Sequence, residues 1–525
     1  MAQNTYDETP YPASSFPQTH PVKLATIAKL FGVSPTAPDR CRVLELGCAD
    51  GSNLIPLAQN YPSSHFVGID LSAVQIGVGK KTIETAGLEN VTLLQQDIAE
   101  YSPDEKFDYI IVHGIFSWVP AAVREKILQI CRDGLTEQSV AYISYNAYPG
   151  WHMREALRDM ALFHIRPFTD VNQRVGQARA LIKFLADSVP TENNPYGLFL
   201  KNEIELMKNW TDGYLRHDLL EENNQPFYFH EFAELAGKFS LQYLGETEFS
   251  SMLATNYPPN IQEALARVGT NIVQMEQYMD FLRNRMFRQT LLVHQDLKLK
   301  RNVETQTFRD CWFTTTLRPT SAEPSLAAGQ KEEFKSPAGG SIATDNVLVK
   351  AVLLTLSRAL PNQVAFPDLI RELRVNLMGN SAVIRDPEAD KREEAFLGQQ
   401  VFALYARGII EMTAFAFPTV GTAGDRPAAS PLARYQALNS RAITNLRHIS
   451  LPVDLFSRHL LSLLDGTKNR EELLAAMIAK VNDNVLNVQQ GGTSVKDPET
   501  LKALLEPRIK GVLDEMARLG LLLPA

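Results

Sequence analysis

The segment VLELGCADGSN at 43–53 has the form of a buried strand, a tight turn and the start of a helix. Gly47 and Gly51 flank the turn, but the position between them is Ala49, so the G-x-G-x-x-G fingerprint of dinucleotide sites is incomplete. No Lys-Ser or Lys-Thr pair follows Gly51, which excludes a P-loop. Glu45 can accept from an ammonium group, and the backbone donors of the turn can hold a carboxylate. The pattern therefore fits an amino-acid head group.

Two further acidic residues end the next predicted strands. Asp70 closes HFVGID about 20 residues beyond the turn, where a carboxylate can accept from both ribose hydroxyls. Asp97 ends VTLLQQD, where it can accept from the amine of adenine while Ile98 packs on the ring. Amino acid, ribose and adenine, in this order, describe S-adenosylmethionine. Two alternatives stay open: a ligand-free turn with both aspartates capping helices, and an NAD enzyme, which Ala49 disfavours.

Composition limits the remaining classes. The chain has 525 residues, 45% of them hydrophobic and 21% charged, so several globular domains are expected. A net charge of -8 disfavours a general nucleic-acid or anionic-membrane binder. The four cysteines form no C-x-x-C pair, so we expect neither disulfides nor a metal site. The sequence predicts no signal peptide and no membrane span, which favours the cytoplasm.

Strand and helix patterns alternate from 41 to about 145, which indicates βαβ units and a parallel sheet. The predicted fold class is α/β, with a Rossmann-like core, a helical insertion and C-terminal α-rich, winged-helix-like domains. The predicted domains are an N-terminal arm or lid (1–40), the core (41–149 and 223–255), a helical regulatory or dimerisation insertion (150–222), a helical connector (256–318), a winged-helix-like domain (346–417) and a C-terminal helical domain (431–525).

The acidic and glycine motifs, E-x-G-x-A-x-G, G-I-D and Q-D at successive strand ends, resemble those of the class I S-adenosylmethionine-dependent methyltransferases. Four longer motifs narrow the resemblance: YDETPYPASSFPQTHP, HGIFSWVP, SYNAYPGWHMRE and DFLRNRMFRQTLL, the last interpreted as helical. They are similar to a bacterial subgroup whose core is followed by a methyltransferase regulatory domain, and to the rickettsial protein-lysine methyltransferases that modify an outer-membrane protein. The resemblance implies S-adenosyl-L-methionine as cofactor, S-adenosyl-L-homocysteine as product, a homodimer and a protein lysine as acceptor.

The resemblance also indicates where the residues of the site lie. The predicted cofactor-binding residues are Glu45, Gly47, Cys48, Ala49, Gly51, Asn53, Asp70, Leu71, Asp97, Ile98 and His113. The ends of the fourth and fifth strands face the methyl group in this fold, so we expect His113 and Tyr145 to position the acceptor or remove its proton. The predicted substrate-binding residues are Phe116, Trp118, Asn146, Tyr148, Trp151, Tyr6 and Tyr11, the last two in an arm that covers the cofactor. Core packing is the alternative for His113, Tyr145 and Trp151.

Two other functions remain compatible with these residues. One is a small-molecule O- or N-methyltransferase with the same cofactor site, which a narrow, closed acceptor pocket would favour. The other is a regulatory or interaction protein that only senses the cofactor, which the set of Glu45, Asp70 and Asp97 disfavours.

Overall fold

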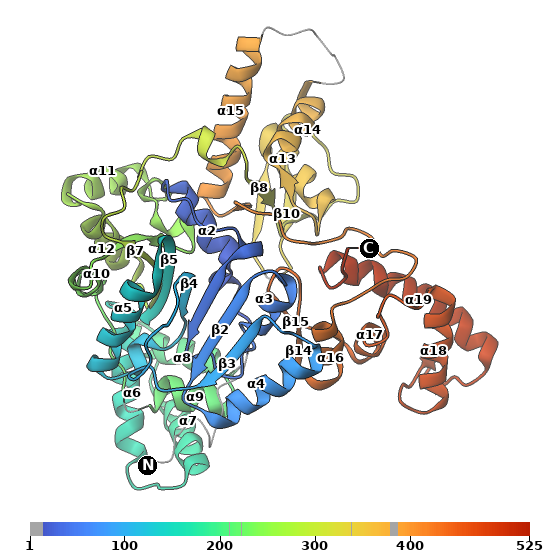
Figure 1. The fold of residues 1–525 in the computed structure, drawn as a ribbon, viewed down its shortest axis with the longest axis horizontal. Helices are drawn as coiled ribbons and strands as arrows, with labels where there is room; N and C mark the ends of the chain where they lie inside the picture. The colour runs from blue at the N-terminus through green and yellow to red at the C-terminus, as the bar shows by residue number, and fades with distance from the viewer. Residues whose placement is uncertain (1–13, 209, 222, 338, 379–386, 525) are drawn as a thin grey trace.

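The computed structural model describes residues 14–524, except 209, 222, 338 and 379–386. Its centre is a seven-stranded sheet with the strand order β3-β2-β1-β4-β5-β7-β6 (Figure 1). The strands are β1 (Arg42–Leu46), β2 (His65–Asp70), β3 (Val91–Gln95), β4 (Phe107–Val112), β5 (Leu135–Asn146), β6 (Leu241–Glu246) and β7 (Phe287–His294). The first five strands pair in parallel, whereas β7 is antiparallel to both β5 and β6. The predicted α/β core is therefore confirmed.

Helices cover both faces of this sheet because its central strands are apolar on both sides. The helices of the core are α3 (Ile55–Asn60), α4 (Ala73–Ala86), α5 (Ala121–Gly134) and α10 (Phe229–Lys238). The arm contributes a short 3-10 turn, η1 (Pro17–Thr19), and the almost fully buried helix α2 (Pro21–Leu30). The His20 side chain caps α2 by accepting from the Val22 N–H at 3.0 Å. The arm thus enters the core instead of lying loosely on it.

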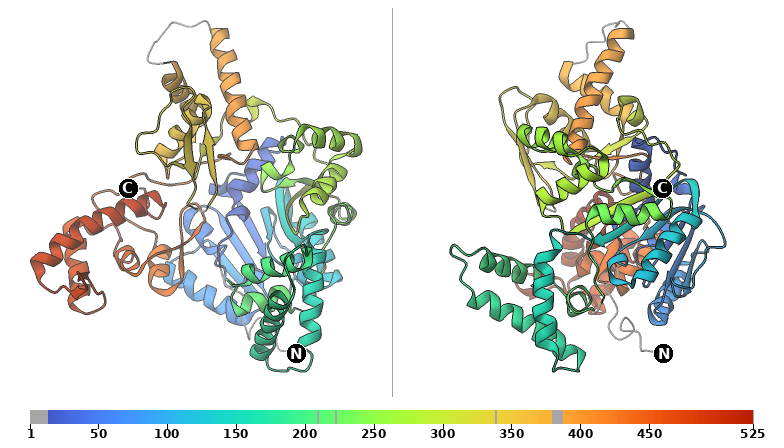
Figure 2. Two further views of the ribbon diagram at one scale, coloured as in Figure 1. Left: turned by 180° about the vertical axis from the view of Figure 1, so that it is seen from behind. Right: turned by 90° about the vertical axis from the view of Figure 1, so that its left-hand side faces the viewer.

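The helical segment after β5 forms a layer with a hydrophobic cluster of its own. Its helices are α6 (Trp151–Ile165), α7 (Val171–Ser188), α8 (Pro195–Met207) and α9 (Asp212–Leu219). They project from the sheet in both views of Figure 2. The helical prediction for 150–222 agrees with these elements.

The region predicted as a helical connector contains a strand of the central sheet. After α11 (Pro259–Val268) and α12 (Ile272–Arg283), Asn284 adopts a left-handed conformation that ends the helix. The chain then forms β7, so the helical interpretation of FRQTLL is wrong. Both faces of β7 are buried, and its sequence therefore lacks the alternation that marks a half-exposed strand.

Two smaller domains follow. The middle domain holds the sheet β12-β8-β13 and three helices, α13 (Val347–Ala359), α14 (Phe366–Met378) and α15 (Pro387–Ala406). Its strands are β8 (Trp312–Thr314), β12 (Val364–Ala365) and β13 (Glu411–Thr413). The run 319–345, interpreted as a loop or linker, forms most of a second sheet from β9 (Arg318–Pro319), β10 (Glu332–Lys335) and β11 (Ser341–Thr344).

The C-terminal domain has a separate hydrophobic core. Its elements are α16 (Pro431–Asn439), β14 (Ala442–Thr444), β15 (Ser450–Pro452), α17 (Leu455–Leu461), α18 (Arg470–Asn482), β16 (Gln489–Gln490), β17 (Thr493–Ser494) and α19 (Pro498–Arg518). Within the described ranges, no helix combines the length and apolar character needed to cross a bilayer.

Candidate active site

The glycine turn after β1 needs a left-handed backbone at three positions. Gly47, Ala49 and Gly51 have φ of +73°, +51° and +74°. At Gly47 a Cβ would lie 2.4 Å from Ile115 Cδ1, so both the conformation and the space require glycine. Ala49 adopts the strained conformation while its N–H donates to Asp70 Oδ2 at 2.8 Å. The turn therefore has the same backbone requirement as a three-glycine turn, with an alanine at its centre.

Glu45 is the buried acid beneath this turn. Its Oε1 accepts from Asn53 Nδ2 at 2.8 Å, while its Oε2 has no hydrogen-bond partner among the described residues. Burial raises the pKa of the Glu45 carboxyl to about 8, an effect that the Asn53 hydrogen bond opposes and that the nearby Asp70 and Asp50 reinforce. A buried carboxyl oxygen without a donor fits an ammonium group, which would satisfy it. The site thus fits the head group of S-adenosylmethionine.

The two aspartates at the ends of β2 and β3 both make hydrogen bonds to the backbone. Asp70 Oδ1 accepts from the Ser72 N–H at 2.9 Å, and Asp97 Oδ1 accepts from the Ala99 N–H at 2.8 Å. Beside them, the Leu71 side chain is 53% exposed and Ile98 is half-buried. A carboxylate accepts several hydrogen bonds, so these local contacts are compatible with a ligand. Partly or largely exposed apolar side chains next to both acids provide a surface on which adenine could pack.

Asn53 joins three parts of the chain at the cofactor turn. Its Nδ2 donates to Glu45, and its Oδ1 accepts from the Phe16 N–H of the arm at 2.9 Å. The same oxygen contacts Nε2 of His448 at 2.8 Å. His448 lies in the C-terminal domain, between β14 and β15, and its side chain is fully buried. We expected Asn53 to bind the cofactor; the structure instead places it between Glu45, the arm and the C-terminal domain.

His113 lies at the end of β4 among aromatic rings. The Phe16 ring centroid is 3.9 Å from that of His113, and the Phe287 ring centroid is 6.4 Å away. His113 Nδ1 lies 2.9 Å from the Tyr142 hydroxyl and 3.3 Å from Ser144 Oγ. Burial lowers the pKa of His113 to about 4, so the imidazole is neutral at pH 7. A histidine with this pKa is a weak base, which favours acceptor positioning over proton removal.

The structure does not place Tyr145 beside His113. Successive residues of a strand point to opposite faces, so Tyr142 contacts His113 while Tyr145 enters the other core cluster. The Tyr145 ring stacks on Phe232 at 4.1 Å, and its hydroxyl lies 3.2 Å from Thr290 Oγ1. Tyr145 is a packing residue, as the alternative interpretation held. Because both faces of β5 are buried, the sequence did not distinguish the two tyrosines.

The other predicted acceptor residues separate into two groups. Phe116 and Asn146 are buried: the Phe116 ring packs on Phe232, and Asn146 Nδ2 donates to Asn224 Oδ1 at 3.0 Å. Neither has the accessible surface that a substrate contact needs. Trp118, Tyr148 and Trp151 lie around the start of α6: Trp118 packs edge-on against Trp151 at 6.2 Å, and the Tyr148 hydroxyl donates to Glu155 Oε1 at 2.7 Å. Tyr6 and Tyr11 lie outside the described residues.

Three models of known families match the chain. A methyltransferase domain covers residues 43–138, a predicted methyltransferase regulatory domain covers 211–294, and a PKMT C-terminal winged helix domain covers 425–521. The structure of PKMT2 from Rickettsia typhi in complex with AdoHcy has 33% identity and a TM-score of 0.87, over 98% of this chain and all of that one. The chain belongs to this family of S-adenosylmethionine-dependent methyltransferases.

Two further relatives are similar to this chain over nearly its whole length. A second structure of Rickettsia typhi PKMT2 aligns with a TM-score of 0.86 and 33% identity, over 98% of this chain and all of that one. An uncharacterized protein of Rickettsia prowazekii is 36% identical over 99% of this chain and 94% of its own length. The cofactor of this methyltransferase is S-adenosylmethionine, as the turn and the aspartates predicted. The regulatory-domain match covers α9, α10, β6 and β7. The match shares only residues 211–222 with the 150–222 insertion, which the sequence analysis predicts as the regulatory or dimerisation segment.

Proposed function

We propose that this methyltransferase acts on a protein, and that the group it methylates is the side-chain amine of a lysine. The observation that carries the proposal is the His113 imidazole surrounded by the rings of Phe16, Tyr142 and Phe287. Aromatic rings attract a cationic or partly cationic amine, and a desolvated site lowers the amine's pKa, which favours the nucleophilic form. The likeness to the PKMT2 structure supports a protein acceptor.

In this proposal the residues at the strand ends hold the two reactants in line. The cofactor supplies an activated methyl group on a sulfonium. Glu45 accepts from the head-group ammonium, Asp70 from the ribose hydroxyls and Asp97 from the adenine amine. His113, with Nδ1 engaged by Tyr142, presents Nε2 to the acceptor. Phe16 covers this position, which excludes water and keeps the amine aligned.

Labelled methyl transfer tests the proposal directly. The protein is incubated with methyl-labelled S-adenosylmethionine and lysine-containing peptides, and the methylated residue is located by mass spectrometry. We expect methylated lysine, and no product from matched peptides in which arginine replaces lysine. Methyl transfer only to small hydroxyl or amine compounds would refute the protein acceptor and favour the small-molecule alternative.

A pair of phenylalanine variants tests the aromatic enclosure. Phe16→Ala removes the ring over His113 but keeps the backbone N–H that donates to Asn53, so we expect kcat/KM to fall by about tenfold. Phe396→Ala, at a side chain 58% exposed on α15, is the matched control and is expected to leave the rate unchanged. Equal rates for both variants would remove Phe16 from the site. A homodimer and a cytoplasmic location also belong to this proposal, and light scattering tests the former.

A further inference from the structure

A cleft of 660 Å³ lies beyond the end of β6 and the start of β7, and every described residue that lines it is polar. Three of these residues are arginines: Arg283, Arg285 and Arg407. The others are Ser250, Ser251, Thr255 and Asn256. Three separate segments supply them: the turns η4 (Phe249–Met252) and η5 (Ala254–Asn256) after β6, the junction between α12 and β7, and the end of α15.

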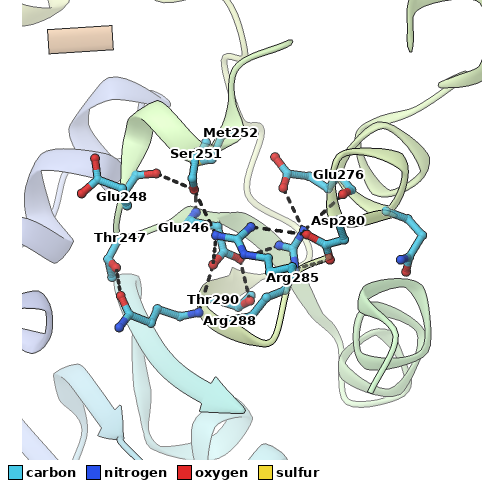
Figure 3. A network of polar contacts seen from close by, with 12 residues as sticks. Glu246, Thr247, Glu248, Ser251, Met252, Glu276, Asp280, Arg285, Arg288 and Thr290 are labelled. Carbon is cyan, nitrogen blue, oxygen red and sulfur yellow. Dashed lines mark hydrogen bonds and ion pairs between the residues drawn. The ribbon is translucent and has the colours of Figure 1, made fainter. Parts of the chain in front are cut away.

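Hydrogen bonds fix these segments to one another, so the fold itself maintains the shape of the cleft. Asn256 Nδ2 donates to the carbonyls of Ser250 and Ala406, both at 2.8 Å, which ties η4 to the middle domain. Arg285 donates to Ser251 Oγ at 3.2 Å and also lies 3.7 Å from Glu246 (Figure 3). Arg285 is therefore held at the wall of the cleft before any ligand arrives.

The acidic groups nearest to Arg285 lie behind the wall. Glu246 and Asp280 are buried, and Arg288 contacts them at 2.6 and 2.7 Å (Figure 3). Glu276 also pairs with Arg288, at 3.0 Å. Arg285 itself lies 3.5 Å from Asp280, so the buried carboxylates share both Arg285 and Arg288, and the exposed Arg283 and Arg407 carry the positive charge that faces the cleft.

The other two arginines lack carboxylate partners within the described ranges. Arg283 donates to the Ser251 carbonyl and lies 4.9 Å from the centre of the Tyr257 ring. Arg407 is exposed, and its side chain makes no hydrogen bond or ion pair with another described residue. The nearest exposed acid is Glu248, whose carboxylate accepts from Ser250 Oγ at 2.8 Å. Planar guanidinium groups that converge on one cleft suit a carboxylate, which they bind through paired hydrogen bonds.

The cleft lies at the same edge of the sheet as His113. Arg285 lies two residues before Phe287, whose ring centroid is 6.4 Å from that of His113. We propose that the cleft binds a carboxylate side chain of the acceptor protein, at a fixed number of residues from the lysine that is methylated. This assignment rests on the proposed function.

Blocked peptides with a single lysine test the placement. One series carries a single glutamate at successive positions before or after the lysine, and a matched series carries glutamine at the same positions. Binding is measured by fluorescence anisotropy with S-adenosylhomocysteine present, and methylation is measured separately. We expect the peptide with glutamate at one of these positions to bind about tenfold more tightly than the other peptides and than its glutamine match, with a preference that salt weakens. Equal binding of all peptides would overturn the cleft assignment.

Variants of the protein locate the preference in the cleft. Arg407→Gln should reduce the affinity for the preferred peptide about tenfold, toward that of the glutamine peptide. Glu248→Gln should increase it, because the variant removes a negative charge from the rim. Arg392→Gln, at an exposed arginine near the other end of α15, is the matched control and should retain the preference. A preference that survives Arg407→Gln would refute the site. If binding depends on the position of the glutamate but no lysine is methylated, the cleft assignment stands and the lysine acceptor is refuted.

Discussion

The buried carboxyl of Glu45 predicts that cofactor binding releases a proton. In the free protein its pKa is about 8 because of burial, so roughly 90% of Glu45 is protonated at pH 7. An ammonium beside Oε2 would favour the ionised form and displace that proton. The α-amino group of the cofactor has a pKa near 7.8 and takes up part of a proton at the same pH. The net release at pH 7 is about 0.8 proton per cofactor bound.

The same two groups set the pH dependence of affinity. Between pH 6 and 7.5 the ionised fraction of Glu45 rises roughly 24-fold, while the protonated fraction of the amine falls to about two thirds. The association constant should therefore increase about 16-fold, or roughly 1.6 kcal/mol. Above about pH 8 the gain reverses, since the amine loses its charge. The association constant rises with pH because the pKa of Glu45 is raised. A glutamate that is already ionised at pH 6 would give no rise in the association constant between pH 6 and 7.5.

Calorimetric titration with S-adenosylmethionine in two buffers of different ionisation enthalpy measures the released protons directly. Glu45→Gln supplies the control, because its amide has nearly the shape of the carboxyl but does not ionise in this range. The variant should bind the cofactor more weakly and with no rise in affinity from pH 6 to 7.5. Wild-type binding with neither proton release nor pH dependence would refute the contact between Glu45 and the ammonium.

Three further predictions concern the turn, the acceptor strand and the buried histidines. Gly47→Ala should lower the free energy of unfolding by about 1–3 kcal/mol, from a left-handed alanine and a steric clash, and an unchanged denaturation midpoint would contradict this. Tyr142→Phe should reduce kcat/KM about tenfold, because it releases Nδ1 of His113. Tyr145→Phe should lower the free energy of unfolding by about 1 kcal/mol and leave kcat/KM within about twofold. A larger loss of kcat/KM in Tyr145→Phe than in Tyr142→Phe would return Tyr145 to the site. His113 and His448 have folded-state pKa values of about 4 and 3, below the unfolded 6.5, so the unfolded chain binds more protons as pH falls below 6.5. At pH 5 each should have lost about 2 kcal/mol of the stability present at pH 7, and urea denaturation of wild type and of each His→Gln variant at both pH values checks this.

The parts of the fold that the sequence predicted are those encoded locally. The strands that end at Leu46 and Asp70 are short apolar runs followed by turn residues, and each has its acid at the carboxyl end, where parallel strands converge. β7 was missed because it follows a helix directly and is buried on both faces, so neither composition nor alternation identified it. The sequence predicted Tyr145 for the site and missed Tyr142, because both faces of β5 are buried as well. Strand order alone does not reveal which of two buried tyrosines faces the site.

The contacts that the sequence could not predict are the long-range ones, and they have a consequence for how the cofactor site forms. Asn53 bonds to Glu45, to the backbone of Phe16 and to His448, so one amide connects the core, the arm and the C-terminal domain. Burial of an amide requires that its donors and acceptors are satisfied together. Loss of the arm contact or the C-terminal contact would therefore expose or strain the hydrogen bond that holds the Glu45 carboxyl. The separate domains of this methyltransferase meet at a residue that touches the acid beneath the cofactor turn, so the site is complete only when all three parts are in place.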